Sequence, residues 1–389
     1  MTFRIRTLNS ISNAGLSRLP KDSYVVGSDV DDPDAIILRS AKLHGVEIPD
    51  SLLAVARAGA GVNNIPIAEY SARGIPVFNT PGANANAVKE LVVAALFLAA
   101  RNLIPAAAFA HRLDGDAESM DKAVEAGKKE FVGFELPGRI LGVIGLGAIG
   151  VEVANAASAL GMRVMGYDPG ITVEHAWKLS SDVEHVTNLD QMLKRADIVT
   201  LHVPLVESTR HLVGSRELGL MKRSAVLINF SRGPIVDQDA VIEALESGNL
   251  RGYVCDFPTP ELNKRPKVVT LPHLGASTTE AEENSARLAV DELRAFLEQG
   301  SITNSVNFPD AVLVRGEGTT RIAIANSNVP NMVGQISTLV AASGLNIADL
   351  LNKSRGGLAY TLVDVEGEVP DTLMAQIRGI DGVLSARVI

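Results

Sequence analysis

Short apolar runs separated by longer amphipathic segments fill the first part of the chain. Four runs have the length and aliphatic content of buried strands, at residues 3–8, 35–38, 53–57 and 75–78. Because helical segments separate them, they predict a small parallel sheet. In such sheets ligands bind beyond the carboxyl ends of the strands. Four residues at those ends are therefore candidate ligand contacts: Arg39, Arg57, Gly59 and Asn79.

A second alternation of strands and helices occupies the middle of the chain. Strands are predicted at residues 140–144, 163–167, 197–204, 225–229, 252–255 and 268–271. Helices are predicted at residues 84–102, 149–160 and 279–299. We expect the last helix to cross back and cover the first sheet, which makes the first domain discontinuous.

The last seventy or so residues predict a smaller unit of a different kind. Strands are expected at residues 321–325, 359–364 and 383–388, a restart of the chain at 344–347, and helices at 332–343 and 372–378. This order is βαββαβ, the ferredoxin-like pattern. The predicted fold class is thus α/β, with two doubly wound parallel-sheet domains and a C-terminal βαββαβ domain. The expected boundaries are 1–84 with 277–304, 85–276, a polar linker at 305–319, and 320–389.

Composition and charge narrow the classes of function. Of the 389 residues, 46% are hydrophobic and 21% are charged, which is typical of a globular chain in water. The net charge of −9 argues against a nucleic-acid partner and requires any site for an anion to gather its own cations. The single cysteine, Cys255, fits a reducing cytoplasm, and no secretory signal or membrane span is expected. The histidines and Cys255 have no metal-ligand spacing.

The strongest motif is Gly145-Leu-Gly-Ala-Ile-Gly150, placed between a strand and a helix. Its glycines permit a tight turn, the close approach of a pyrophosphate, and the packing of the helix on the strand. Asp168 ends the next strand, where a carboxylate can accept hydrogen bonds from ribose hydroxyls and repel a 2′-phosphate. Residues 85–276 are therefore interpreted as a Rossmann domain that binds NAD rather than NADP. A glycine-rich turn without a nucleotide is the alternative, and the strand, helix and acid around the motif disfavour it.

Three polar residues follow consecutive strands of this domain and suit the oxidation of a 2-hydroxy acid. Arg232 presents a planar fork that matches a carboxylate. His273 can accept the hydroxyl proton, and Glu261 can orient the histidine and raise its pKa. Each residue alone has a structural alternative: Arg232 could brace a turn, His273 could be packed in the structure, and Glu261 could be a solvated charge. Together they favour catalysis.

At these residues the chain resembles the D-isomer-specific 2-hydroxyacid dehydrogenases, over nearly its whole length. The matching segments are residues 39–41, 57–64, 74–81, 145–150, 229–234 and 272–278. The resemblance implies that Arg232, Glu261 and His273 are catalytic and that 1–84 with 277–304 is a flavodoxin-like substrate-binding domain. It implies cofactor contacts at Gly145, Gly147, Ala148, Ile149, Gly150, Asp168, His202, Val203, Pro204, Ser231, Asp256 and Gly275. It implies substrate contacts at Arg39, Arg57, Gly59, Ala60 and Asn79.

The chain departs from the family pattern at two places. Asp256 and Phe257 are adjacent, whereas the family usually has one residue between them before its glutamate. Ala60 stands where close relatives often carry a threonine, so no polar role is assigned to it. The spacing from Asp256 to Glu261 still matches, which keeps Glu261 as the expected acid.

The same resemblance suggests a particular substrate and an effector. Arg39 and Arg57, with Lys128 and Lys129 as further candidates, could hold the phosphate of 3-phospho-D-glycerate, whose oxidation gives 3-phosphonooxypyruvate. Residues 320–389 resemble an ACT domain, a regulatory module that binds amino acids where two copies pair. An L-serine effector site is expected to use Asn326, Asn328 and Asn346, although Asn331 replaces the usual glycine of that loop. The alternative is that this domain only dimerises.

The family also implies a homodimer or homotetramer, with the substrate in a cleft between two α/β domains. Two other functions remain open at the level of sequence. One is the oxidation of an unphosphorylated 2-hydroxy acid, which leaves Arg39 and Arg57 without a role. The other is a non-catalytic NADH-sensing protein like the C-terminal-binding-protein corepressors, although no partner-binding extension is evident.

Overall fold

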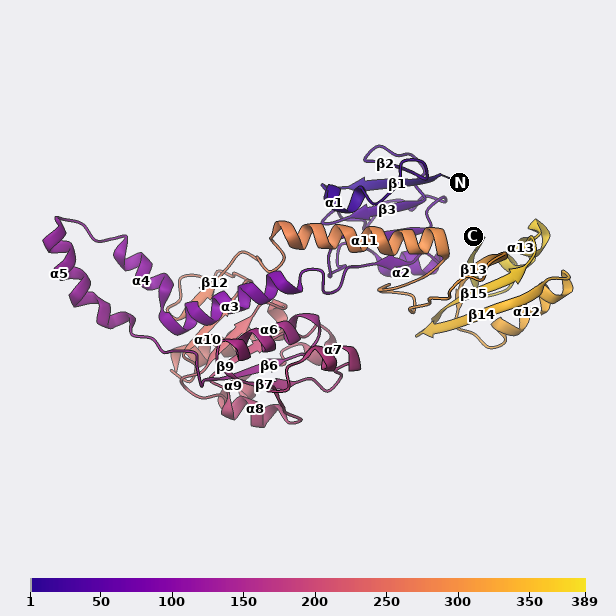
Figure 1. Ribbon diagram of the computed structural model, residues 1–389. Helices are drawn as coiled ribbons and strands as arrows, with labels where there is room; N and C mark the ends of the chain where they lie inside the picture. The colour runs from indigo at the N-terminus through magenta and orange to yellow at the C-terminus, as the bar shows by residue number, and fades with distance from the viewer. Residues whose placement is uncertain (1) are drawn as a thin grey trace. The chain divides into compact units, whose positions relative to one another are not determined.

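The computed structural model describes residues 2–389, which form two compact units. One unit contains the chain up to Asn84 and resumes at Thr279, and the other is Ala85–Thr278 (Figure 1). The first unit is discontinuous in sequence, because α11 (Thr279–Gln299) returns to the first sheet.

The first unit begins with a five-stranded parallel sheet in the order β2-β1-β3-β4-β5. This is the flavodoxin-like order, and it confirms the predicted fold class. The sequence pattern missed β2, a four-residue strand whose Val25 is half exposed, so that it lacks the apolar run of a central strand. The strands are β1 (Phe3–Leu8), β2 (Tyr24–Gly27), β3 (Ala35–Leu38), β4 (Ala54–Arg57) and β5 (Val77–Phe78). The helices with them are α1 (Asn13–Leu16), α2 (Ile67–Ala72) and α11.

The second unit is built on a seven-stranded parallel sheet in the order β12-β11-β10-β9-β6-β7-β8. The order reverses between β9 and β7 around β6, which is the switch point of a doubly wound fold. Its strands are β6 (Ile140–Ile144), β7 (Arg163–Tyr167), β8 (Glu184–His185), β9 (Ile198–Leu201), β10 (Val226–Asn229), β11 (Gly252–Cys255) and β12 (Val268–Thr270).

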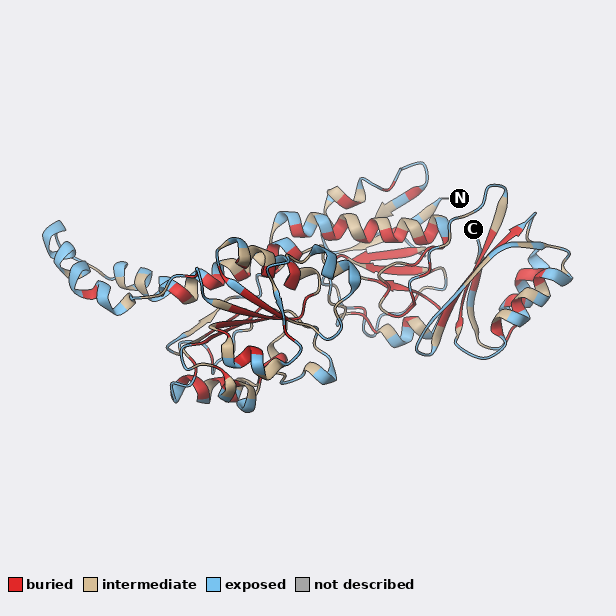
Figure 2. Ribbon diagram, turned by 60° about the horizontal axis from the view of Figure 1, so that its bottom comes forward, coloured by how far each residue is buried: buried red, intermediate tan, exposed pale blue. Residues whose placement is uncertain are grey.

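Helices cover both faces of this sheet, and the central strands between them are buried (Figure 2). They are α3 (Ala85–Arg101), α6 (Ala148–Ala159), α7 (Val173–Lys178), α8 (Leu189–Arg195), α9 (Ser215–Leu220) and α10 (Gln238–Glu246). Short 3₁₀ turns lie at Lys128–Phe131, Glu207–Thr209 and Gly233–Ile235.

Two further helices project from the second unit (Figure 1). Asn102 adopts a left-handed conformation with φ 50°, which ends α3 and starts α4 (Leu103–Ala110). The chain continues through α5 (Ala117–Gly127) before it returns to the sheet. We call residues 103–131 the arm. None of the residues of α4 is buried although its sequence is almost wholly apolar.

The C-terminal residues form a four-stranded antiparallel sheet in the order β14-β15-β13-β16. The element order is βαββαβ, as predicted. The elements are β13 (Thr319–Ser327), α12 (Met332–Ala342), β14 (Asn346–Arg355), β15 (Leu358–Glu366), α13 (Asp371–Arg378) and β16 (Val383–Val388). We call this part the C-terminal module.

The C-terminal module is less separate than the sequence suggested. One face of its sheet packs on α12 and α13. From the other face, Ala323, Tyr360 and Leu362 join the core around Phe296 and Phe308 of the N-terminal fold. Residues expected to be a linker take part in this core, because Phe308 and Ala311 are almost fully buried. The segment is polar in sequence, but its polar side chains are themselves bonded: Asn307 bonds to Ser71, Ile75 and Val77.

By length and composition, no single helix of residues 2–389 could span a membrane. Only α3 and α4 taken together pass that test, and they are bent by 66°.

Candidate active site

Six neighbouring strands of the second unit end at one edge of its sheet, and the predicted site residues follow them. The glycine motif follows β6 and Asp168 follows β7. His202 follows β9, Ser231 and Arg232 follow β10, Asp256 follows β11, and His273 follows β12. All these strands are parallel, so their carboxyl ends gather the nucleotide motif and the candidate catalytic groups at the same edge.

The three glycines of the motif meet different constraints. Gly145 has φ 90°, and a Cβ there would lie 2.6 Å from the carbonyl oxygen of His202. A Cβ on Gly150 would lie 1.9 Å from the carbonyl oxygen of Gly145, so the start of α6 needs glycine to pack. Gly147 has an ordinary φ of −77° and open space around the position of a Cβ. The fold itself therefore does not require glycine at Gly147, whereas a ligand that approaches the backbone there does.

The start of α6 and Asp168 fit the two ends of a dinucleotide. Ala148 and Ile149 begin α6, whose first backbone N–H groups have no partner within the helix and favour a phosphate. The Asp168 carboxylate accepts the N–H of Leu146 and that of Gly170, both at 2.8 Å. These bonds fix the carboxylate, and each oxygen keeps a lone pair for a ribose hydroxyl. The residues present thus fit NAD.

His202, Val203 and Ser231 support this edge by packing and hydrogen bonds. His202 Nε2 lies 3.0 Å from Thr200 Oγ1, and burial lowers the pKa of His202 to about 3. This histidine is neutral near pH 7 and is not a proton carrier. The Ser231 hydroxyl donates to the carbonyl oxygen of Val203, which joins the ends of β9 and β10. Pro204 follows and is exposed.

Asn229 positions Arg232 and was missed by the sequence analysis. Its fully buried side chain donates from Nδ2 to the carbonyl oxygen of Arg232 at 2.9 Å and accepts the N–H of Ser231 at 3.1 Å. Arg232 Nη1 donates to the carbonyl oxygen of Ser231 at 2.6 Å. The available signal was an amide side chain at the end of an otherwise apolar strand.

His273 and Asp256 lie together at the ends of β12 and β11. His273 has φ 51°, and its N–H donates to the carbonyl oxygen of Asp256 at 3.1 Å. The exposed His273 ring stands edge-on to Phe257, with ring centroids 5.3 Å apart. Asp256 is 1% exposed, and its Oδ1 has no hydrogen-bond partner among the described residues. Burial raises the pKa of Asp256, while the charges of His273 and Arg232 and the N–H of Gly275 oppose that rise.

Glu261 lies on the exposed loop after Asp256 and has other partners. Its own backbone N–H and the Thr259 hydroxyl lower the pKa of its carboxyl, with smaller contributions from Gln238 and Arg265. Arg265 Nε also donates to the carbonyl oxygen of Glu261 at 2.5 Å. Within residues 2–389 no hydrogen bond or ion pair joins Glu261 to His273. The acid that the structure joins to His273 is Asp256, through the bond from the His273 N–H to the Asp256 carbonyl oxygen and through an electrostatic interaction with its carboxyl group.

The expected substrate contacts lie at the carboxyl edge of the first unit's sheet. Arg57 Nε donates to the carbonyl oxygen of Arg39 at 3.0 Å, which connects the ends of β4 and β3. Gly59 has φ 151°, and a Cβ there would meet the Arg57 guanidinium at 2.5 Å. Asn79 Nδ2 donates to the carbonyl oxygen of Ala60 at 2.6 Å. The edge thus gathers all five predicted residues. Lys128 and Lys129 belong to the second unit, where Lys128 is paired with Glu125.

The expected effector residues do not converge within one chain. Asn326 is 1% exposed, its Nδ2 donates to the carbonyl oxygen of Ser327, and its Oδ1 accepts from Thr361. Asn328 is exposed and donates to Gly356. Asn346 donates to Glu366. Asn326 pairs with Ala359 and Asn346 with Glu366 on β15, so these two asparagines lie roughly 23 Å apart along the sheet. Asn331 keeps the left-handed turn, with φ 65°.

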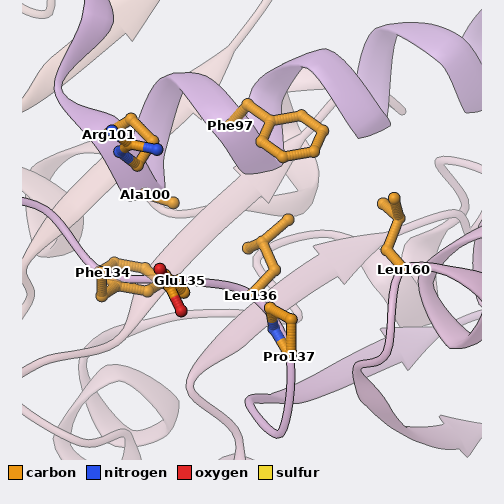
Figure 3. A pocket seen from close by; sticks show the side chains of 8 residues that line it. All are labelled: Phe97, Ala100, Arg101, Phe134, Glu135, Leu136, Pro137 and Leu160. Atoms are coloured by element: carbon orange, nitrogen blue, oxygen red, sulfur yellow. The ribbon is translucent and has the colours of Figure 1, made fainter.

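The apolar pocket in the second unit lies away from this chemistry. It has a volume of about 260 Å³, and Phe97, Arg101, Leu136 and Leu160 are among the residues that line it (Figure 3). Leu136 precedes β6, and Leu160 ends α6, so the pocket lies at the amino edge of the sheet. No group of three or more His, Cys, Asp or Glu side chains could hold a metal in the described part of the chain.

Comparisons with known proteins agree with this site. Residues 101–275 match the family model of the D-isomer specific 2-hydroxyacid dehydrogenase, NAD binding domain. The chain belongs to the D-isomer-specific 2-hydroxyacid dehydrogenase family, and it is an NAD-dependent oxidoreductase.

Its relatives include a particular enzyme of that family. The chain is 33% identical over 355 residues to D-3-phosphoglycerate dehydrogenase of Haemophilus influenzae, covering 88% of this chain and 83% of that protein. It is 37% identical over 290 residues to the enzyme of that name from Methanocaldococcus jannaschii, covering 72% of this chain and 53% of that protein. Among solved structures, D-mandelate dehydrogenase of Rhodotorula graminis aligns with a TM-score of 0.68 at 25% identity, covering 81% of this chain and 100% of that one.

Proposed function

We propose that the chain oxidises 3-phospho-D-glycerate to 3-phosphonooxypyruvate with NAD, the first step of the phosphorylated route to L-serine. The observation that carries the proposal is the group formed by Arg232, Asp256 and His273 at the edge that bears the glycine motif. Relatives named D-3-phosphoglycerate dehydrogenase, at 33–37% identity, support this substrate.

The residues of the second unit have distinct roles in this reaction. Arg232 binds the carboxylate of the hydroxy acid, because a guanidinium matches a carboxylate in a bidentate fashion. His273 accepts the proton of the C2 hydroxyl. NAD, when bound through Gly145, Gly147, Gly150 and Asp168, supplies the acceptor of the hydride. Asn229 holds Arg232 in place through its bond to the Arg232 carbonyl oxygen.

Two carboxylates compete for the role of partner to His273. The family resemblance favours Glu261, while the contact in the structure favours Asp256, which is buried beside the histidine. Substituting Glu261→Gln and Asp256→Asn separately distinguishes them. The partner's loss lowers kcat by about 10²-fold or more and changes the pH profile of kcat/KM, because the histidine loses the charge that orients it.

The first unit supplies the groups proposed to bind the substrate's phosphate. Arg39 follows β3, Arg57 is the last residue of the neighbouring β4, and the Arg39 carbonyl oxygen accepts a hydrogen bond from Arg57. A chain with a net charge of −9 needs such a local pair of cations to hold a dianion. Oxidation of an unphosphorylated 2-hydroxy acid is the second candidate, since it uses the same catalytic edge.

The test is the initial rate of NADH formation from 3-phosphoglycerate and NAD. It is repeated with NADP, with D-glycerate, and with millimolar L-serine. We expect turnover that requires the phosphate and NAD. If D-glycerate were turned over as fast as 3-phosphoglycerate, the proposed substrate would be wrong. Tight binding of NADH without turnover of any hydroxy acid would contradict the proposed reaction and would favour a protein that senses NADH. His273→Ala is expected to abolish most turnover, and unchanged turnover would contradict the catalytic assignment.

We further propose that the chain acts in the cytoplasm as a homodimer or homotetramer, and that L-serine regulates it through Asn326, Asn328 and Asn346. The separation of Asn326 from Asn346 along one sheet supports a site shared by two copies of the C-terminal module. Turnover indifferent to serine would leave that module with a structural role. The exposed apolar α4 supports self-association.

A further inference from the structure

An ion pair occupies the edge of the first unit where the phosphate is proposed to bind. Arg39 Nη1 lies 2.5 Å from Glu282 Oε1. Arg39 follows β3, and Glu282 is in the first turn of α11. Their side chains are 34% and 47% exposed, so both can exchange partners with a solute.

The packing of α11 fixes Glu282 at this position. A Cβ on Gly15 would lie 2.5 Å from the backbone of Ala286, so α1 and α11 are in backbone contact. Ala286, one turn beyond Glu282, is buried in that contact. On the other side, the Arg39 carbonyl oxygen accepts from Arg57 Nε at 3.0 Å and from Asn64 Nδ2 at 3.3 Å. The backbone that carries each residue of the ion pair is therefore held in place by its neighbours.

The neighbouring acid on α11 has a different partner. Glu283 is bonded to Arg287 at 2.8 Å, one turn further along the same helix. Of these two adjacent carboxylates, only Glu282 pairs with a residue proposed to bind substrate. This difference provides a matched control, because either residue can be changed to glutamine with the same change in net charge.

We infer that Glu282 is a specificity-determining residue whose carboxylate holds the guanidinium of Arg39 until an anionic group of the substrate replaces it. This inference rests on the proposed function of Arg39. An exposed ion pair contributes little to stability, so a phosphate can open it at small cost. A dianionic phosphate competes with a carboxylate for a guanidinium, whereas an uncharged hydroxymethyl group does not. The ion pair thus raises the KM of phosphorylated hydroxy acids, whose phosphate must displace Glu282, and leaves the KM of unphosphorylated ones unchanged.

The inference is tested by steady-state kinetics of the full-length protein with Glu282→Gln and, as the control, Glu283→Gln. Glu282→Gln is expected to lower KM for the phosphorylated substrate by about two- to fivefold, the range of an exposed ion pair, with little of the effect in kcat. KM for D-glycerate is expected to stay the same. Glu283→Gln should leave both KM values close to those of the natural protein. Arg39→Ala should remove the advantage of Glu282→Gln when the two are combined.

Inhibition by inorganic phosphate separates this inference from the proposed function. Its Ki is measured against whichever hydroxy acid the enzyme oxidises, and it should fall in Glu282→Gln by the same factor as the KM. If D-glycerate is oxidised as well as its phosphorylated form, the proposed substrate fails, while a lower Ki still supports the role of Glu282. An unchanged or higher Ki, or an equal fall in Glu283→Gln, would overturn it. Thermal unfolding of both variants checks that the fold is retained.

Discussion

Gly147 and Gly150 lie one helical turn apart, and the structure requires them for different reasons. Gly147 faces open space, so a methyl group there disturbs no protein atom. We expect Gly147→Ala to retain the thermal stability of the natural protein and to lose about tenfold or more in NADH affinity, because the methyl group fills the place of the pyrophosphate. A fluorescence titration with NADH measures the affinity.

Gly150→Ala should give the opposite pattern. Its Cβ would lie 1.9 Å from the Gly145 carbonyl oxygen, which cannot move without shifting the end of β6. We expect a loss of about 3 kcal/mol in the free energy of unfolding, as in an overpacked core. Urea unfolding of both variants makes the comparison. Equal stability of the two proteins would show that the backbone contact at Gly150 is not limiting.

Glu292 is a buried acid that the proposed reaction does not use. It is 3% exposed, and its Oε1 accepts from Asn304 at 2.7 Å. Its Oε2 has no hydrogen-bond partner within the described residues. Burial raises the pKa of Glu292 to about 8, and the carboxylates of Asp291 and Asp310 act in the same direction. The folded protein therefore keeps this group protonated near pH 7.

Glu292→Gln should stabilise the protein increasingly as the pH rises. Between the ordinary pKa of 4.5 and the raised value of about 8, only the unfolded state ionises at Glu292, so its contribution to stability falls over this window. Glutamine keeps the bond to Asn304 and does not ionise. We expect a gain of about 3 kcal/mol at pH 7 and almost none at pH 4.5. The exposed Glu280→Gln is the control, and parallel pH profiles of the natural protein and Glu292→Gln would contradict the prediction.

At the residue scale, the sequence indicated which side chains gather at an edge but not which side chains touch. Arg232 and His273 were placed correctly at strand ends because strand direction follows from chain order. The partner of His273 could not be derived, because loop conformation decides whether Asp256 or Glu261 faces the ring. The burial of Asn326 could not be predicted from the sequence either, because it depends on the hydrogen bond from Thr361 on another strand.

Among the elements, α11 has both ends tied to other parts of its unit. Its first turn bonds to Arg39, and its last carbonyl oxygens accept from arginines of the C-terminal module. Arg321 donates to the carbonyl oxygen of Gln299 at 2.9 Å, and Arg387 donates to those of Leu297 and Phe296. Cations at a helix C-terminus also interact favourably with the helix dipole. The C-terminal module therefore caps the helix that begins next to the substrate edge of the same unit.

Arg321 is also paired with an acid inside the C-terminal module. Its Nε and Nη2 donate to the Asp364 carboxylate at 2.6 and 2.7 Å, and both side chains are at most 1% exposed. Arg321→Leu should lower the free energy of unfolding by about 3–5 kcal/mol, because Asp364 is left buried and unpaired. The double variant with Asp364→Leu should recover much of that loss. Arg287→Leu, which breaks an exposed pair, should cost less than about 1 kcal/mol.

Urea unfolding measures all three proteins under the same conditions. If the double variant were no more stable than Arg321→Leu, the cost would come from the lost cap and not from the unpaired acid. At this scale the sequence predicted the bounds of β1, β6 and α11, but it predicted only the first residues of β14 (Asn346–Arg355). It did not predict α5, in which only Gly127 is buried and the apolar Met120 and Val124 are exposed.

At the scale of the whole molecule, the arm exposes apolar side chains that no other described part of the same chain covers. Leu103 and Ile104 are 46% and 44% exposed, and Val124 on α5 is 39% exposed. If the chain self-associates through the arm, Ile104→Glu with Val124→Glu should lower the molar mass measured by light scattering to that of a single chain. Val173→Glu, at a 74% exposed position of the same unit, is the control. An unchanged mass in the arm variant would place the interface elsewhere.

The sequence predicted the architecture of the whole chain better than it predicted the boundaries between the domains. Three sheets, their strand directions and the return of α11 follow from the order of apolar runs. The core that the C-terminal module shares with the N-terminal fold could not be predicted from those runs. Ala323 and Leu362 belong to strands with the alternating pattern of any sheet that has two different faces. Whether the second face meets water or another domain depends on contacts with Phe296 and Phe308, far away in sequence.

The return of α11 also constrains how the protein is made. The first sheet leaves the ribosome complete at Asn84, but the helix that covers it begins only at Thr279. At about 5–20 residues per second, the nascent chain waits roughly 10–40 s for that cover. During this time the face of the sheet with Ile37 and Ala56, fully buried in the finished fold, lacks α11, the long helix that packs on it. A newly made chain therefore stays soluble in this interval only if aggregation is slow or a chaperone covers that face until α11 has been synthesised.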